Sequence, residues 1–346
     1  MILYICSDES DYLQDLTYAG LCDVLGKDNV WDYPFHWQYH SEKKFFWNRK
    51  EEYPRNLGYV PTDKLCTVSS LSELTQSLRK NHFDLVVLAS AKPDALHVFE
   101  SLFDDFKCPW IFIDGGDWQG IGGDFKRLGG ETSFKLFEEL SNEKRPGIIF
   151  KRELPLNVNY DFVFPLQFSV HASRAPVLDP QTPKKYQVLF WAVESSPVRK
   201  QAFKLLEGRY DCESNGSVQG QKFRKYRFRG VNYFKALSES RINLSFRGEG
   251  FDTLRYWETP ASGSLLISEQ PTIQIPNNFA YSRQAVFCKP DLSNLLSLID
   301  YYLGHENERI DIAREGQKHL LQHHTHIKRA EYLLDIVESR LKLRLR

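Results

Sequence analysis

One stretch of 29 residues, RINLSFRGEGFDTLRYWETPASGSLLISE, which runs from residue 241 to residue 269, constrains the fold most strongly. It opens with Arg241–Phe246, a short and mostly apolar run that is typical of a buried parallel strand. A glycine-bracketed loop follows, and residue 252 or 253 is placed to cap a helix over Thr253–Thr259. Ser264–Ser268 is the next strand. Strand, glycine loop, helix and strand form half of a dinucleotide-type fold, which binds ligands at the carboxyl ends of its strands.

The chemistry at that edge suits an anionic nucleotide. The helix start at Thr253 offers unpaired backbone N–H groups and the positive end of a dipole. Gly248 lets phosphate oxygens approach the backbone, and Arg247 and Arg255 can each form forked bonds to phosphate. Glu258 lies three residues after Arg255, so the two side chains share a helix face, where a carboxylate can accept bonds from ribose hydroxyls. The alternative interpretation is a solvated Arg–Glu pair beside glycines that only turn the chain.

The segment Phe246–Glu258, FRGEGFDTLRYWE, resembles the donor site of exostosin-like glycosyltransferases. The wider region, Tyr233–Leu334, is similar to the spore-maturation-type (group 1) glycosyltransferases. The resemblance implies the GT-B architecture, an α/β fold in which two Rossmann-like domains face each other across a cleft. It also implies that Arg247 and Arg255 hold the diphosphate of a sugar nucleotide and that Glu258 holds its ribose.

The chain departs from that family pattern at one point. Many retaining members carry two glutamates with seven residues between them. Counting back from Glu258 at that spacing leads to Gly250, and Glu249 lies one residue too far. Retention of the anomeric configuration is therefore not supported by the spacing, although a shifted loop could still use Glu249.

The rest of the chain predicts two domains of alternating strands and helices. We expect an N-terminal Rossmann-like acceptor domain over residues 1–165 and a proline-rich linker over 166–185. A C-terminal Rossmann-like nucleotide-sugar domain is expected over 186–324. The amphipathic segment 325–346 is expected to form a C-terminal helix that crosses back to the first domain, as in GT-B enzymes.

Three aspartates of the first domain are candidates for the catalytic base. Asp114 and Asp117 follow a predicted strand, Trp110–Asp114, and precede a glycine-rich turn, so they lie on the ligand side of the fold. Asp8 follows the first strand. Glycosyl transfer needs one group to take a proton from the acceptor hydroxyl, and Asp117 is the better candidate. Loop aspartates also commonly cap helices or form turns.

Composition excludes several classes of protein. The 346 residues carry 45 basic and 45 acidic side chains, so a globally basic nucleic-acid binder is not indicated. A hydrophobic content of 42% supports large cores rather than disorder. No apolar run reaches the length of a membrane span, and the opening MILYICSDESD does not resemble a signal peptide. The six scattered cysteines are most simply interpreted as free thiols. Together with the lack of a membrane span and of a signal-peptide pattern, they predict a cytoplasmic protein.

The sequence thus predicts a glycosyltransferase that moves a sugar from a nucleotide-diphosphate sugar to a hydroxyl acceptor. The chain has no Asp-x-Asp, which favours a metal-independent reaction without a cofactor. One alternative is a two-domain protein that binds a nucleotide or sugar without chemistry. Another is a transferase acting on modified nucleic acid, through the basic and aromatic run Gln221–Gly230 and the aromatic segment Pro34–Pro61, but this is not favoured.

Overall fold

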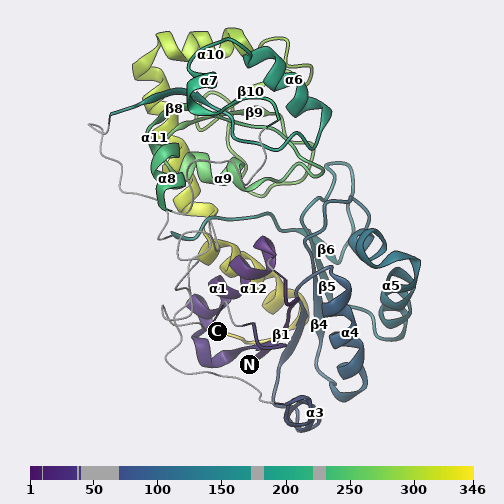
Figure 1. Cartoon of the computed structure of the whole chain (residues 1–346). Coiled ribbons are helices and arrows are strands. Elements are labelled where there is room, and N and C mark those ends of the chain that lie inside the picture. Colours follow the sequence, from purple (N-terminus) through teal and green to yellow (C-terminus); the bar gives the residue numbers. More distant parts are fainter. Residues whose placement is uncertain (10, 37–38, 40–69, 173–182, 221–230) are drawn as a thin grey trace. The chain divides into compact units, whose positions relative to one another are not determined.

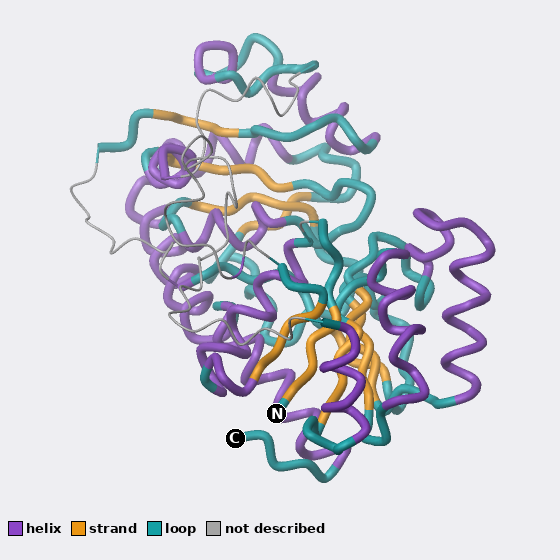
Figure 2. The backbone as a smooth tube through the Cα atoms, turned by 60° about the horizontal axis from the view of Figure 1, so that its bottom comes forward, coloured by secondary structure: helices purple, strands orange, loops and turns teal. Residues whose placement is uncertain are grey.

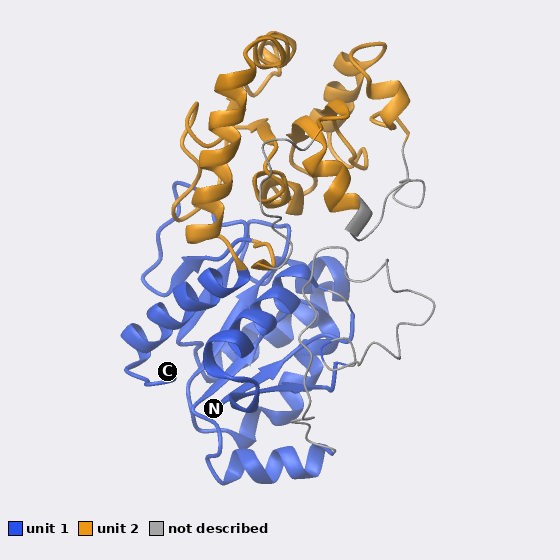
Figure 3. Cartoon of the chain, turned by 90° about the vertical axis from the view of Figure 1, so that its left-hand side faces the viewer, with its two compact units in different colours: residues 1–48, 59–167, 326–346 blue, residues 49–58, 168–325 orange. Residues whose placement is uncertain are grey.

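The computed structural model describes residues 1–9, 11–36, 39, 70–172, 183–220 and 231–346 (Figure 1). The basic run Gln221–Gly230 and most of the aromatic segment Pro34–Pro61 lie outside the described residues. The chain divides into two compact units, shown in different colours in Figure 3. The described residues of unit 1 lie within 1–48, 59–167 and 326–346, and those of unit 2 are 168–172, 183–220 and 231–325.

Unit 1 is built on a parallel sheet of six described strands in the order β2-β1-β3-β4-β5-β6. The strands, seen as orange bands in Figure 2, are β1 (Ile2–Ile5), β2 (Val30–Tyr33), β3 (Leu85–Leu88), β4 (Trp110–Asp114), β5 (Ile148–Lys151) and β6 (Val163–Pro165). Four of them are buried along their whole length. Such strands occur in parallel sheets that helices cover on both faces.

The helices of unit 1 divide between the two faces of this sheet. They are α1 (Tyr12–Leu25), α3 (Leu71–Arg79), α4 (Pro93–Leu102), α5 (Gly123–Glu143) and α12 (His326–Leu341). Alternate residues of β1 point to opposite faces. Leu3 joins the core with α3, α4 and α5, whereas the hydroxyl of Tyr4 donates to the carbonyl of Gln14 on α1.

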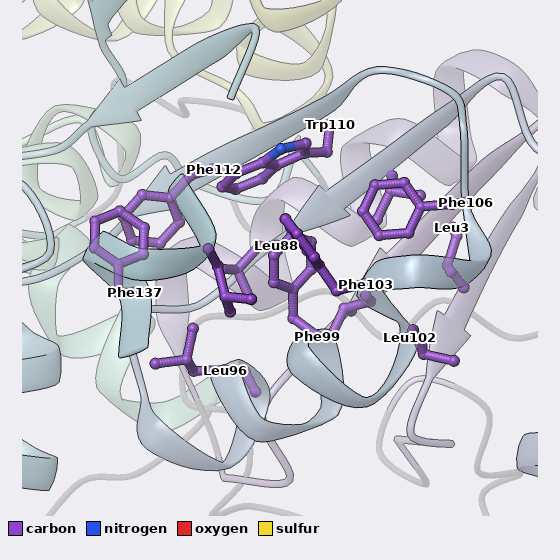
Figure 4. Packing of buried hydrophobic residues seen from close by; sticks show 14 of the residues in the cluster. Leu3, Leu88, Leu96, Phe99, Leu102, Phe103, Phe106, Trp110, Phe112 and Phe137 are labelled. Carbon is purple, nitrogen blue, oxygen red and sulfur yellow. The ribbon is translucent and has the colours of Figure 1, made fainter. Parts of the chain in front are cut away.

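An aromatic core fills the face under α4 and α5 (Figure 4). Phe99 lies 4.7 Å from Trp110 and Phe112 lies 5.0 Å from Phe137, measured between ring centroids. Rings at these separations and tilts add about 1 kcal/mol each beyond the area that they bury. This core fixes β4, and with it the loop in which Asp114 and Asp117 lie.

The C-terminal helix α12 belongs to unit 1 and packs along α1. Gly20 permits this contact, because a β-carbon there would overlap the backbone carbonyl of His326 and approach Ala330 to 2.9 Å. The ring of His326 also lies 2.9 Å from the carboxylate of Asp23. The chain thus returns to the first unit at residue 326.

Unit 2 contains a second parallel sheet, with the described strands in the order β10-β9-β8-β7. The strands are β7 (Tyr186–Leu189), β8 (Ser240–Ser245), β9 (Leu265–Glu269) and β10 (Val286–Cys288). The helices are α6 (Pro197–Leu206), α7 (Cys212–Asn215), α8 (Val231–Ser238), α9 (Leu254–Ala261), α10 (Leu295–Gly304) and α11 (Glu306–His323). One core joins the sheet to α6 and α10, and another joins it to α8 and α9.

The predicted α/β class with parallel sheets in two Rossmann-like units is confirmed. The helix expected over Thr253–Thr259 begins at Leu254 and continues to Ala261, with Pro260 in its last turn. The sequence pattern missed α5 altogether. Among the described residues, none of the helices combines the length and apolar character that crossing a membrane requires.

Candidate donor site and candidate base

The side chains of the loop between β8 and α9 bond to neighbouring parts of unit 2, and the N-cap side chain makes no bond to the helix start. Thr253 stands at the N-cap, but its side chain does not cap the helix, because its hydroxyl lies 2.9 Å from that of Ser245. The buried carboxylate of Asp252 accepts bonds from the indole of Trp257 and the backbone N–H of Phe168, both at 2.7 Å. The expected side-chain cap is therefore absent. The hydroxyl of Thr253 therefore does not occupy the start of α9, the end of a helix that can bind an anion.

Arg247 lies just past the end of β8, against the end of β9. Its backbone N–H donates to Glu269 over 2.6 Å, and its guanidinium Nε lies 3.4 Å from the same carboxylate. Ser196, the N-cap of α6, donates its hydroxyl to the carbonyl of Arg247 over 2.7 Å. These contacts fix the backbone, while 46% of the Arg247 side chain remains exposed. A half-exposed guanidinium on a fixed backbone is placed to receive a phosphate.

Glu269 is the charge partner that sequence reasoning missed. Burial raises the pKa of its carboxyl, and the backbone N–H and guanidinium of Arg247, with the charge of Arg199, act in the opposite direction. Glu269 is the last residue of β9 and Arg247 lies just past β8, and these strands pair in parallel, with Ser245 opposite Ser268. The contact between Arg247 and Glu269 depends on that strand register, so no local sequence motif could have revealed it.

Gly248 lies where α6 begins. A β-carbon at this position would come within 3.2 Å of the Ser195 hydroxyl and 3.3 Å of the Arg199 guanidinium. Arg199 donates to the carbonyls of Phe246 and Val193, each over 3.0 Å. The side chain of Arg199 therefore holds the loop, and glycine at 248 keeps space beside it.

Arg255 and Glu258 are brought together by a residue that spacing alone did not reveal. The hydroxyl of Tyr233, on α8, donates to Glu258 over 2.7 Å and accepts from Arg255 over 3.3 Å. Glu258 is 2% exposed and Tyr233 is 8% exposed, so this network is buried apart from the partly exposed Arg255. Burial raises the pKa of Tyr233, Glu258 raises it further, and Arg255 opposes both. The phenol therefore stays protonated and donates to the carboxylate.

Asp114 is committed to holding its own loop. It is fully buried and lies 3.1 Å from the ammonium of Lys151, which is also fully buried. Its two carboxylate oxygens accept bonds from the backbone N–H groups of Gly116, over 3.1 Å, and Gly122, over 2.7 Å. These contacts leave the carboxylate of Asp114 less accessible than those of the other two candidates for the base.

Asp117 and Asp8 are more accessible. The side chain of Asp117 is 31% exposed and forms an ion pair with Arg152, which is itself buried. Asp8 is exposed, and its backbone N–H donates to Asp94 over 2.9 Å. Both follow strands of the same parallel sheet, as expected from the sequence. The predicted donor residues belong to unit 2, and these aspartates belong to unit 1.

Comparison with known proteins finds a family model that matches part of the chain. Residues 197–335 match the family model described as "Glycosyl transferase-like". No curated protein matches the chain. The region matched contains α6, the β8–α9 loop, α9 and α11, and therefore includes Arg247, Arg255, Glu258 and Glu269.

Solved structures similar to this chain have the GT-B fold. Anabaena Alr3699/HepE in complex with UDP matches with a TM-score of 0.62 and 11% identity, over 98% of this chain and 99% of that chain. A glycosyltransferase from Rickettsia africae matches with a TM-score of 0.56 and 12% identity, over 99% of each chain. An alpha-glucosyltransferase in complex with UDP and a 13-mer DNA matches with a TM-score of 0.53 and 10% identity, over 97% and 98%. At these identities the likeness shows the fold alone.

Proposed function

We propose that this protein, which has the GT-B fold and whose residues 197–335 match the glycosyl transferase-like family model, moves a sugar from a nucleotide-diphosphate sugar to a hydroxyl acceptor. The observation that carries the proposal is a hydrogen-bond network. In it the hydroxyl of Tyr233, on α8, joins Arg255 and Glu258, which lie on the helix that follows the glycine loop. It pairs a cation suited to phosphate with a carboxylate suited to hydroxyl groups. A sugar nucleotide carries phosphate groups and ribose hydroxyls only a few bonds apart.

Each donor-site residue has a role in this proposal. Arg247 and Arg255 bind the diphosphate together with the first N–H groups of α9, while Gly248 and Thr253 leave the backbone open to it. Glu258 accepts hydrogen bonds from the ribose hydroxyls. Tyr233 is a positioning residue, because it fixes the carboxylate of Glu258 and one guanidinium nitrogen of Arg255 by the same hydroxyl.

The reaction itself exchanges one bond at the anomeric carbon for another. The oxygen of the acceptor bonds to that carbon, and the bond to the β-phosphate oxygen breaks, leaving its electron pair on the diphosphate. Arg247, Arg255 and the helix N–H groups stabilise the developing charge. Because the chain has no Asp-x-Asp, we propose that no metal takes part, and a chelator should leave turnover unchanged.

The proton of the acceptor hydroxyl goes to a carboxylate of unit 1. Asp117 and Asp8 are the two more accessible candidates, and Asp117 is the stronger because it lies on a loop that ion pairs hold in place. The ion pair with Arg152 holds the carboxylate of Asp117 in place. Asp117→Asn and Asp8→Asn distinguish the two. The substitution at the base should lower kcat by at least 100-fold, and the other should change kcat by less than threefold.

A thermal-shift screen against nucleoside diphosphates, followed by a donor-turnover assay, tests the proposal. A ligand at 100 times its Kd adds about 2.7 kcal/mol of stability, which gives a measurable rise in Tm. We expect one nucleoside diphosphate to raise the Tm and its sugar conjugate to be consumed. Binding without consumption, with or without added acceptors, would identify a binding protein instead, and no shift with any nucleotide would reject the donor site.

A further inference from the structure

The loop after β4 in unit 1 is held unusually firmly for a surface loop. Its sequence, from residue 114 to residue 123, is DGGDWQGIGG. The buried pair of Asp114 and Lys151 holds one side, and the pair of Asp117 and Arg152 holds the other. Arg152 also donates from Nε to the carbonyl of Gly115 over 2.8 Å. The conformation of this loop is therefore fixed by these ion pairs together with Ile121, which packs against the hydrophobic core of the unit.

This loop presents a large aromatic ring to solvent. Trp118 is 47% exposed, among the large hydrophobic side chains that the structure leaves most accessible. Its covered part lies on the start of α5, where a β-carbon at Gly123 would come within 3.0 Å of the Trp118 β-carbon and 3.4 Å of its ring. Glycine at 123 thus lets the indole lie on the backbone. An exposed indole on a fixed loop costs solvation free energy, and a ligand that covers it would recover that cost.

We propose that Trp118 and Asp117 form an acceptor subsite for a pyranose ring, so that the hydroxyl acceptor is itself a sugar or glycan. The inference rests on the proposed transferase function. The apolar C–H face of a pyranose packs on the open part of the indole, and the adjacent carboxylate of Asp117 accepts a bond from a ring hydroxyl. The ion pair with Arg152 fixes that carboxylate, one residue before Trp118 in the chain.

The charge of the loop favours a neutral sugar over a nucleic acid. Residues 114–123 contain two aspartates and no lysine or arginine. The two cations that pair with those aspartates, Lys151 and Arg152, have side chains that are 0% and 4% exposed. A bound phosphodiester would have no accessible cation of this loop to neutralise it, and nucleic-acid binding depends on such neutralisation.

Fluorine NMR on the full chain labelled with 5-fluorotryptophan tests this subsite directly. The chain has seven tryptophans, and the resonance lost in Trp118→Phe assigns Trp118. The probes are methyl pyranosides and short oligosaccharides of glucose, galactose, mannose and N-acetylglucosamine at millimolar concentration. We expect at least one probe to shift the Trp118 resonance in a saturable manner. A resonance that no sugar moves would overturn the proposal, as would one that shifts only with a single-stranded oligonucleotide.

Variants connect this binding to the reaction. Trp118→Ala should weaken binding of the responding sugar at least tenfold, and Trp118→Phe should weaken it less. Leu156→Ala, which removes another exposed apolar side chain of the same unit, should leave binding unchanged. Equal affinity of Trp118→Ala and the parent would also overturn the subsite.

The test separates failure of the subsite from failure of the donor site. The nucleoside diphosphate that raises the Tm of the parent protein should raise that of Trp118→Ala equally, because the donor residues belong to unit 2. If the nucleotide binds and the sugars do not, only the acceptor subsite is rejected. If no nucleotide binds the parent protein, the transferase proposal fails, and the subsite that depends on it fails with it.

Discussion

At the residue scale, spacing predicted which donor-site residues could share a face but not which residue joins them. Arg255 and Glu258 lie three apart, and the structure places both at the hydroxyl of Tyr233. Tyr233 precedes them by more than 20 residues and lies on another helix, so no local pattern indicated it. The same limit applied to Asp114 and Asp117, because their partners, Lys151 and Arg152, lie on the next strand of the sheet and just beyond it.

Changing Glu258 should reduce donor turnover. Glu258→Gln keeps the shape of the side chain but removes the charge that accepts ribose hydroxyls. We expect kcat/KM for the donor to fall at least tenfold, which is about 1.4 kcal/mol of transition-state stabilisation. Steady-state kinetics measure this, with Glu315→Gln on the exposed face of α11 as the control. Parent-like kinetics in Glu258→Gln would remove Glu258 from the donor site.

Removing the Tyr233 hydroxyl should weaken donor binding more than it slows chemistry. Tyr233→Phe keeps the ring in its core and deletes one hydrogen bond to Glu258 and one from Arg255. We expect KM for the donor to rise about three- to tenfold, in line with about 1 kcal/mol, and kcat to change less than twofold. Tyr301→Phe, which removes the hydroxyl of an exposed tyrosine on α10, is the matched control. A purely structural tyrosine would lower the Tm and leave KM unaltered.

At the element scale, helices and strands with clear end signals were predictable. The residues of β4 are those that the sequence indicated, and the helix expected over Thr253–Thr259 differs from α9 by one residue at its start and two at its end. The α5 helix was missed because Gly129 and Gly130 interrupt it, and Gly130 has a φ of 73° within the helical run. Gly129 is required by packing, since a β-carbon there would come within 2.6 Å of Pro93. Tertiary contact therefore overrides local helix preference at this position.

The contact between α1 and α12 should be sensitive to a single methyl group. Gly20→Ala places a β-carbon against the backbone carbonyl of His326, which cannot move without shifting α12. We expect a loss of about 2 kcal/mol in the free energy of unfolding, measured by urea denaturation. Gly304→Ala, at the end of α10 with open space around it, should be neutral or slightly stabilising. If the two variants unfold alike, α12 does not pack on α1 as described.

At the scale of the whole molecule, buried thiols should make stability fall in alkali. Burial raises the pKa of Cys22, Cys212 and Cys288 from 9.0 to about 12. Above pH 9 the unfolded chain therefore loses protons that the folded chain keeps, so the stability present below pH 9 is lost as the pH rises toward 12. Lys184 acts in the opposite direction, because burial lowers its pKa to about 8, but it is a single group.

Urea midpoints between pH 8 and pH 10.5 measure this dependence. Each thiol contributes at most about 1.4 kcal/mol per pH unit once the unfolded chain is ionised. Cys212→Ala should lessen the decline, whereas Ser238→Ala, on the surface of α8, should leave its slope intact. A stability that holds constant through this range would show that the thiols titrate alike in both states.

The account as a whole depends on the diphosphate of a donor lying at the β8–α9 loop of unit 2. A crystal structure of the protein with the nucleoside diphosphate that raises its Tm is the most direct measurement. We predict phosphate oxygens within hydrogen-bond distance of the Arg247 and Arg255 guanidinium groups and the α9 N–H groups, with the ribose hydroxyls on Glu258. A nucleotide bound elsewhere, with these three side chains in their present contacts, would contradict the account.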